Sequence, residues 1–184
     1  AGFAPVEMVQ VSADEIFICG ETGIIALKLT DRISDLVFKA DWIPIAECQD
    51  ITKTVKGKTL ILIGSKLFLL EKNRKMSLYF DTKLKGKFNL FADSRDNTWL
   101  TDKFNNKIYR LSGGELKEIK PHTRIGKFTE ILAPSVISIF EDRENNLWFG
   151  TDGNGVLLYS PGQVQFQKSN IGFTRCIAAF NTKM

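Results

Sequence analysis

Short apolar runs separated by turn residues make up most of this chain. Near the C-terminus, "VISIFED" is followed by a turn, "NLWFG", a second turn, "GVLLYS", a Pro-Gly turn and "VQFQK". "VQFQ" alternates apolar and polar residues, as an outer strand with one hydrated face does, whereas "GVLLY" is apolar on both faces, as a buried inner strand is. Runs that are this short, β-branched and aromatic predict four antiparallel strands joined by tight connections.

The same pattern occurs earlier in the chain. The segment "ADSRDNTWLTDKFNNKIYRL" (92–111) aligns with "EDRENNLWFGTDGNGVLLYS" (141–160) when Trp99 is placed on Trp148, an offset of 148 − 99 = 49 residues. Without a gap, this alignment matches three further pairs: Asp93 with Asp142, Asn97 with Asn146, and Asn106 with Gly155. Asn is among the few non-glycine residues that accept a left-handed conformation, so the last pair predicts a shared turn.

Two weaker copies lie upstream. "SADEIFICGETGIIALKL" and "KGKTLILIGSKLFLL" each contain a turn, an apolar run and a second run, and we place Gly20 and Gly64 at the position of Gly150. Four units spaced by about 40–50 residues indicate a repeat architecture. With four short strands in each unit, the sequence predicts an all-β fold, a β-propeller.

The predicted blades divide the chain 1–184 into four parts. We expect them at Val6–Lys39, Ile45–Phe80, Phe88–Lys120 and Val136–Lys168, with a longer connection at Pro121–Pro134 that has room for a short strand. The segment 172–184 resembles the start of a fifth blade, because Phe180 follows Phe140 by 40 residues. A partial ring would expose the edges of its end sheets, so we expect self-association or a larger parent protein.

The motif carries a family resemblance. "ISIFEDRENNLWFGTDGNGVLLYSP" resembles the two-component regulator propeller repeat, and "LFADSRDNTWLTDKFNNKIYRL" is a weaker match that has Thr101 in place of Gly150. The resemblance implies a periplasmic sensor region of a hybrid two-component regulator of the Bacteroidetes type, joined by a membrane helix outside this chain to a histidine kinase. It implies recognition of glycan-derived oligosaccharides and no catalysis by this segment. A protein-binding scaffold and a propeller lyase or glycosidase remain alternatives.

Composition and charge narrow the choice of partners. The net charge is +4 and the lysines are scattered, which indicates a solvated face more than a nucleic-acid surface. Cys19, Cys48 and Cys176 have no C-x-x-C spacing; at most one pair can form, and Cys19 in "IFICG" is expected to pack as a small hydrophobe. No apolar run approaches the length of a membrane span.

For most residues that could take part in catalysis or binding, the sequence favours a structural role. Trp99 and Trp148 recur at one position, which favours blade-to-blade packing over a ligand platform. Gly150 and Gly155 suit close approach and a left-handed turn, since no helix follows to complete a phosphate loop. Asp142 and Glu144 suit a turn, with calcium binding a minority reading. We predict no cofactor, metal or catalytic residue, although a carboxylate pair of the glycosidase type stays open.

Three residues outside the repeated pattern are candidate ligand contacts. Trp42, in "ADWIPI", is expected in the connection between the first two blades, where it would stack on a sugar ring or, on the alternative that we favour, plug the neighbouring blade. Arg124 and Lys127, in the long connection, are weaker candidates for polar contacts.

Overall fold

The computed structural model describes residues 5–20, 22–28, 39–44, 48–71, 73–125, 128–131, 135–153, 155–160 and 166–169. These residues form strands and turns and contain no helix. Side chains are described for all of them except 39–42, 122–125, 128–131 and 166–169. The predicted segment 172–184 and Cys176 lie outside the described residues.

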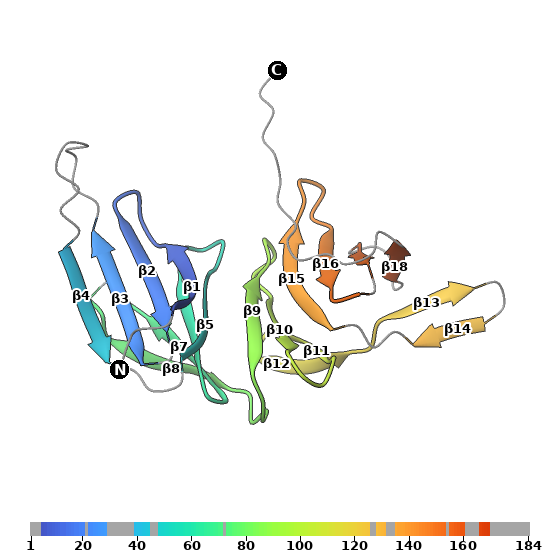
Figure 1. Ribbon diagram of the computed structural model, residues 1–184, viewed down its shortest axis with the longest axis horizontal. Coiled ribbons are helices and arrows are strands. Elements are labelled where there is room, and N and C mark those ends of the chain that lie inside the picture. The colour runs from blue at the N-terminus through green and yellow to red at the C-terminus, as the bar shows by residue number, and fades with distance from the viewer. Residues whose placement is uncertain are drawn as a thin grey trace, which may run out of the picture. The chain divides into compact units, whose positions relative to one another are not determined.

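Four antiparallel sheets, each of four strands in sequence order, form the fold (Figure 1). The first contains β1 (Pro5–Gln10), β2 (Glu15–Gly20), β3 (Gly23–Lys28) and β4 (Lys39–Pro44), and the second β5 (Cys48–Lys53), β6 (Thr59–Ile63), β7 (Lys66–Leu70) and β8 (Met76–Asp81). The third contains β9 (Phe88–Ala92), β10 (Thr98–Asp102), β11 (Ile108–Ser112) and β12 (Glu115–Ile119), and the fourth β15 (Val136–Glu141), β16 (Leu147–Thr151), β17 (Val156–Tyr159) and β18 (Phe166–Ser169). The fold is a β-propeller with four blades, which confirms the predicted class.

The long connection carries more structure than one strand. Strands β13 (His122–Ile125) and β14 (Phe128–Ile131) pair as an antiparallel hairpin between the third and fourth blades. The chain divides into two compact units, Ala1–Asp96 and Asn97–Met184. The first unit therefore contains the first two blades and β9, and the second contains β10–β12, the hairpin and the fourth blade.

The inner strands explain the sequence pattern. In β6 and β10 nearly every side chain is buried, and the run of Leu60, Ile61 and Leu62 is at most 1% exposed. The outer strands β8 and β12 are mostly exposed. The buried strand β6 is apolar apart from Thr59, whereas β10 also buries Thr98, Thr101 and Asp102.

A disulfide joins the first two blades. Cys19 at the end of β2 and Cys48 at the start of β5 form this bond, and both residues are at most 2% exposed. Cys19 is thus buried as expected, but as half of a covalent link and not as a free small hydrophobe. The bond lies in the core cluster that contains Phe17, Ile61 and Leu70.

Polar side chains also connect neighbouring blades within the first unit. Asp50, 5% exposed, accepts hydrogen bonds from the backbone N–H of Ile51 at 2.7 Å and of Leu90 in β9 at 2.6 Å. Gln49 accepts one from the N–H of Phe88 at 2.9 Å. The two side chains bind the backbone of the next blade's first strand, which satisfies donors that would otherwise be buried unpaired.

Candidate functional site

The turn between the first and second strands repeats one geometry along the chain. In the second, third and fourth blades it contains a left-handed residue, Gly57, Asp96 or Asn145, with φ of 74°, 66° and 61°. In each case the N–H of that residue donates to the carbonyl three residues earlier, in Thr54, Asp93 or Asp142. This equivalence identifies the turns as one structural unit.

The side chain that opens each turn fixes the loop. Asp142 Oδ1 accepts from the N–H of Glu144 at 3.0 Å and of Asn146 at 2.8 Å, and Asp93 Oδ1 accepts from the N–H of Arg95 at 3.0 Å. Such bonds from a side chain to its own local backbone stabilise a turn. In Asp142, burial raises the pKa, but hydrogen bonds from Trp148 and Asn146 outweigh it and hold the pKa below its usual value.

The second turn corrects the alignment of the two motif copies. Thr101 pairs with Ile108, whereas the equivalent Gly150 pairs with Val156, so the third blade has one more residue between its paired positions. The gapless alignment therefore does not extend through this turn, but the left-handed conformation predicted for Asn106 and Gly155 is confirmed, with φ of 56° and 72°. The longer loop is held by Asp102, whose Oδ1 accepts from the N–H groups of Phe104 and Asn105.

Trp99 is fully buried in the second unit. Its ring meets the edges of Phe149 and Tyr159 in the fourth blade, with centroids 5.6 Å apart in both pairs. The Arg110 guanidinium lies over the same ring at 5.8 Å and donates to the Tyr159 hydroxyl at 3.4 Å. This cluster of Trp99, Arg110, Phe149 and Tyr159 is called the aromatic interface below.

Trp148, the equivalent residue of the fourth blade, is only half-buried. Its indole N–H donates to Asp142 Oδ2 at 2.7 Å, and Asn146 donates to the same oxygen at 3.0 Å. In this blade, therefore, a hydrogen bond to the turn holds the tryptophan in its orientation.

The strand register identifies the residues that take the place of tryptophan in the first two blades. Phe140 pairs with Trp148, and the corresponding pairs are Val9 with Phe17 and Thr52 with Leu60. Phe17 and Leu60 are therefore the equivalents that sequence comparison missed.

The same register corrects the glycine equivalence. Gly150 pairs with Ser138, and the residues that hold this place in the first two blades are Cys19 and Leu62, not Gly20 and Gly64. The two upstream glycines lie one and two positions later, where each strand passes into its turn, which is why they resembled the motif.

A pocket lies between the first two blades, within the first unit. It encloses about 200 Å³ and is lined by Val11, Ser12, Glu15, Phe17, Gly57, Thr59, Leu70 and Glu71. Its apolar lining consists of Val11, Phe17 and Leu70, of which Phe17 and Leu70 are 3% and 5% exposed. Glu15 pairs with Arg74 across 3.7 Å, and the Lys53 ammonium donates to the Val11 carbonyl at 2.8 Å.

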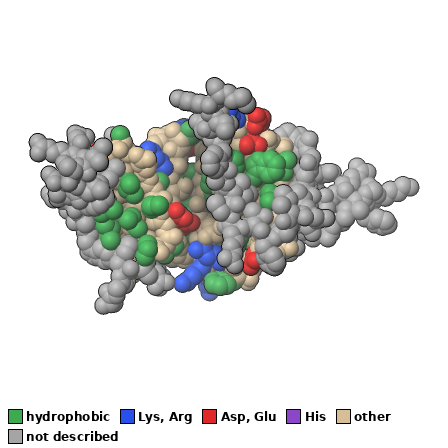
Figure 2. Space-filling model, turned by 45° about the horizontal axis from the view of Figure 1, so that its top comes forward, with side chains coloured by type: hydrophobic (Ala, Val, Ile, Leu, Met, Phe, Trp, Pro, Cys, Tyr) green, Lys and Arg blue, Asp and Glu red, His purple; other side chains and the backbone are tan. Residues whose placement is uncertain are grey.

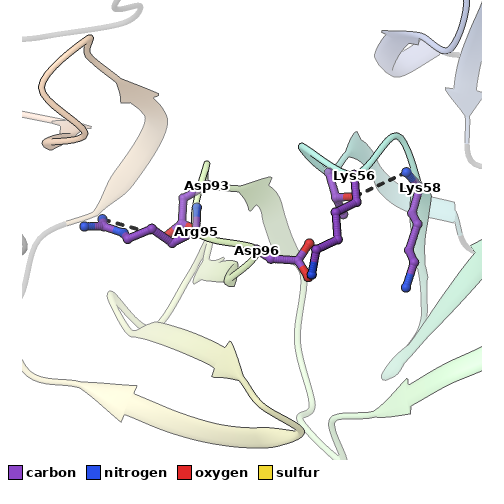
Figure 3. Close-up of polar contacts among 6 residues, drawn as sticks. Lys56, Lys58, Asp93, Arg95 and Asp96 are labelled. Carbon is purple, nitrogen blue, oxygen red and sulfur yellow. Dashed lines mark hydrogen bonds and ion pairs between the residues drawn. The ribbon is translucent and has the colours of Figure 1, made fainter.

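Charged side chains also connect the turns of the second and third blades. Lys56 reaches from the β5–β6 turn to Asp96 in the β9–β10 turn, with Nζ and Oδ2 2.7 Å apart (Figure 3). The hydrogen bond to Asp96 raises the pKa of Lys56. On the face in Figure 2, the basic and acidic side chains of the described residues lie in separate small groups.

The predicted ligand contacts lie elsewhere. Trp42 was expected in a connection, but it belongs to β4 and pairs with Ile25, because the first blade extends to Pro44 and not to Lys39. Arg124 lies in β13, opposite Thr129. Lys127 is outside the described residues, and the side chains of Trp42 and Arg124 are not described.

Two further features, a metal site and a membrane-spanning helix, were examined among the residues that the structure describes. Across the residues that the structure describes, no group of three or more His, Cys, Asp or Glu side chains could hold a metal ion. The same residues include no helix that is both long and apolar enough to cross a membrane.

Comparison with known families supports the reading of the motif. Residues 131–153 match the family described as two component regulator propeller, and this segment contains Asp142, Asn146 and Trp148. The chain carries a two component regulator propeller repeat. No curated protein matches the chain.

Solved structures share the fold at low sequence identity. A catalytically inactive virginiamycin B lyase from Staphylococcus aureus, solved with quinupristin, matches 90% of this chain with a TM-score of 0.64 and 16% identity. Extracellular domains of two putative hybrid two component systems from B. thetaiotaomicron match 91% and 89%, with TM-scores of 0.63 and 0.60 and identities of 11% and 12%. The chain spans 55% of the lyase, and 23% and 22% of those two domains.

Proposed function

We propose that this chain is the extracytoplasmic, ligand-sensing propeller segment of a hybrid two-component regulator, and that its ligands are glycan-derived oligosaccharides. The propeller repeat at residues 131–153 is the observation that carries the proposal. The likeness to extracellular domains of two hybrid two component systems supports it at the level of the fold. The segment itself acts by binding and is not an enzyme.

A periplasmic location fits the chemistry of the first unit. Cys19 and Cys48 form a buried disulfide between two blades. Disulfides form and persist in oxidising compartments, such as the bacterial periplasm, and are rare in the cytosol. The bond supports placement outside the cytoplasm.

The proposed mechanism is allosteric. Ligand binding would favour one arrangement of self-associated propellers, and that preference would pass through a membrane helix outside this chain to a kinase. A ligand shifts such an equilibrium only through its different affinities for the two states. The relevant measurement is therefore ligand affinity in each arrangement.

A protein-binding scaffold is the second candidate, and exposed apolar side chains favour it. Met8 is 66% exposed, Leu78 56% and Phe104 72%. The Asp102 turn holds the backbone at Phe104, so this aromatic is presented to solvent by a fixed loop. Aromatic side chains on fixed backbones are common anchors of interfaces.

Gene context and binding together test the proposal. A membrane span and a kinase domain downstream in the same reading frame are expected, and their absence would overturn it. Calorimetry of the complete extracellular region with a set of oligosaccharides then separates sensor from scaffold. Cleavage of quinupristin, or release of reducing ends from a polysaccharide, would show that the non-catalytic assignment is wrong.

A further inference from the structure

Strand β8 is the outer strand of the second sheet and has β7 as its neighbour on one side (Figure 1). No described strand pairs with its other edge. Three of its side chains are exposed, Met76 at 37%, Leu78 at 56% and Tyr79 at 44%. An open edge with exposed apolar side chains is a template on which another extended chain pairs.

The other three outer strands contain the charged or proline residues that prevent pairing at an edge. These residues are Lys39, Asp41 and Pro44 in β4, Glu115, Lys117 and Glu118 in β12, and Lys168 in β18. The run Met76–Phe80 contains neither a charged residue nor a proline. Among the four outer strands, β8 is therefore the one whose edge is not protected in this way.

The turn before β8 shows which of its backbone groups face the open edge. The Glu71 N–H donates to the Lys75 carbonyl at 2.9 Å, so the backbone of Lys75 points toward β7. Backbone N–H and C=O groups of successive strand residues point to alternate sides. Ser77 therefore also points toward β7, whereas Met76 and Leu78 direct their N–H and C=O groups to the open edge.

The stretch that is available for pairing is short and has two different faces. Its regular part ends at Leu78, since Tyr79 is an extra residue in the register with β7. Strand side chains alternate between faces, so Met76 and Leu78 share an apolar face. Lys75 and Ser77 share the other face. A strand added to this edge thus meets apolar side chains on one face and a cation with a hydroxyl on the other.

Four exposed lysines lie around β8, and none of them has an ion pair within the described part of the chain. Lys58 Nζ lies 6.0 Å from the centre of the Tyr79 ring. The other three are Lys75 just before β8, Lys66 opposite its last residue, and Lys83 two residues after it. Positive charge that is not neutralised beside a free edge favours an acidic partner.

A second copy of this chain is a poor occupant of the same edge. Antiparallel pairing of two β8 strands brings Lys75 of one copy beside Lys83 of the other, and facing like charges are unfavourable. The carboxylate at the end of β8 does not offset them, because Asp81 Oδ1 already accepts from the Lys83 N–H at 3.0 Å. Charge therefore selects a partner that is more acidic than this chain.

We propose that the β8 edge binds an extended acidic peptide segment of a protein partner, which adds to the second sheet as a fifth strand. It runs antiparallel to β8, as every neighbouring pair in this sheet does. Its apolar residues lie opposite Met76 and Leu78 and exchange backbone hydrogen bonds with them. Its acidic residues alternate with these, on the face of Lys75 and Ser77. Main-chain bonds of this kind provide affinity, and alternating side chains provide specificity.

The proposal goes beyond oligosaccharide sensing and does not rest on it. Peptide binding at β8 holds or fails whatever glycans the complete extracellular region binds. The two functions are also separable by experiment, because the peptide tests below contain no sugar and use the 184-residue chain alone.

Calorimetry with short blocked peptides tests the chemistry of the partner. The probe is Glu-Val-Glu-Val-Glu-Val-Glu, and the matched peptide has lysine in place of each glutamate. We expect the acidic probe to bind one to one, about tenfold more tightly than the lysine peptide, and about threefold more weakly when salt rises from about 50 to about 300 mM. Equal affinities for the two peptides, or no binding of the acidic one, would overturn the proposal.

Methylation of the peptide backbone tests the strand pairing and leaves the protein unaltered. N-methylation of the three valines removes the N–H groups that bond to Met76 and Leu78, and should weaken binding about tenfold or more. N-methylation of the two inner glutamates alters N–H groups on the far edge and should change the affinity by less than about twofold. Equal effects, or the reverse order, would contradict antiparallel pairing at this edge.

Variants of the chain locate the binding. Leu78→Pro removes one N–H that has no partner in the sheet, a position at which an outer strand accepts proline. The variant should stay folded, as circular dichroism checks, and lose most of its affinity for the probe. Lys75→Gln and Lys58→Gln should each weaken binding about twofold to threefold. Lys117→Gln, an exposed lysine in the outer strand β12, is the matched control and should have no effect.

Amide hydrogen exchange shows whether the peptide pairs with the predicted groups. The bound probe should slow exchange about tenfold at Met76 and Leu78. Exchange at Ser77, whose N–H already points toward β7, should change little. Slower exchange at β12 in place of β8 would assign the peptide to another edge and overturn the proposal. Protection of Met76 and Leu78 that rises with the concentration of the free chain would show that a second copy is the occupant.

Discussion

The two units stabilise their blade contacts in different ways. In the second unit, Trp99 packs against Phe149 and Tyr159, with the Arg110 guanidinium over its ring. In the first unit, smaller side chains hold the equivalent positions, and the Cys19–Cys48 disulfide links the blades instead. The repeated fold thus tolerates loss of its aromatic anchor where a covalent bond holds the contact together and a pocket is left between the blades.

Removing the ring should have its largest effect in the second unit. Trp99→Ala is expected to lower the free energy of unfolding by about 3–5 kcal/mol, because it removes transfer free energy and leaves a cavity in a packed contact. Phe17→Ala should cost less, about 3 kcal/mol, since its site already borders a cavity and holds a smaller ring. Guanidinium denaturation measures both values. A loss at Phe17 equal to or above that at Trp99 would break the comparison.

Loss of the Cys19–Cys48 disulfide should lower the free energy of unfolding almost as much as Trp99→Ala does, and the bond lies in the first unit. Replacing Cys19 and Cys48 together by Ala is expected to cost about 3–4 kcal/mol, the chain-entropy value for a bond between residues 29 apart. Denaturation with and without reductant measures it. Reductant should have no effect on the stability of the double variant, and Cys176→Ala serves as the cysteine control. If the denaturation midpoint of the double variant is unchanged, side-chain packing alone holds these two blades together.

How much the sequence predicts depends on how local each feature is. The four-strand blades and the role of Asp142 follow from apolar runs and turn residues within a few positions of one another. The equivalence of Phe17 with Trp99 does not, because only an apolar character is shared and the register is needed to align the strands. Pairing of Cys19 with Cys48 requires β2 and β5 to be neighbours, which spacing alone does not show.

The sequence does not predict the pocket or the strand position of Trp42, because both depend on which strands pair with each other. The pocket is lined by residues from two blades, and none of these residues is unusual by itself in the sequence. Trp42 is outside the repeated sequence pattern and is therefore predicted to lie in a connection, yet it belongs to the outer strand β4 and pairs with Ile25 in β3. The pairing of the backbone strands, which the sequence pattern does not show, determines the pocket lining and the position of Trp42.

The hydrogen bond of Trp148 separates its role from that of the buried Trp99. A double-mutant cycle with Trp148→Phe and Asp142→Asn should give a coupling of about 1.5 kcal/mol, the lower end for a bond to a charged group because the pair is half exposed. A coupling near zero, measured by denaturation, would mean that packing alone orients Trp148.

The same carboxylate predicts a pH dependence. The pKa of Asp142 is lower in the folded chain than the unfolded value of about 3.9, so its stabilising contribution is present above that pH and is lost as pH falls through the folded pKa. Asp142→Asn should therefore reduce the loss of stability between about pH 4 and pH 2, as followed by tryptophan fluorescence. An unchanged acid midpoint would contradict the assignment.

The smallest expected effect concerns the second turn, where the two blades of the motif differ by one residue. Gly155→Ala should cost about 1–2 kcal/mol, because a φ of 72° brings the added Cβ close to the following carbonyl. Asn106→Gly should change stability by less than about 0.5 kcal/mol, since Asn already accepts its φ of 56° in the longer, Asp102-held loop. Thermal denaturation of both variants compares the turns directly. If Gly155→Ala left the stability unchanged, the short turn would accommodate an alanine at this φ without strain. The one-residue difference in length between the two turns would then not reflect a backbone requirement for glycine.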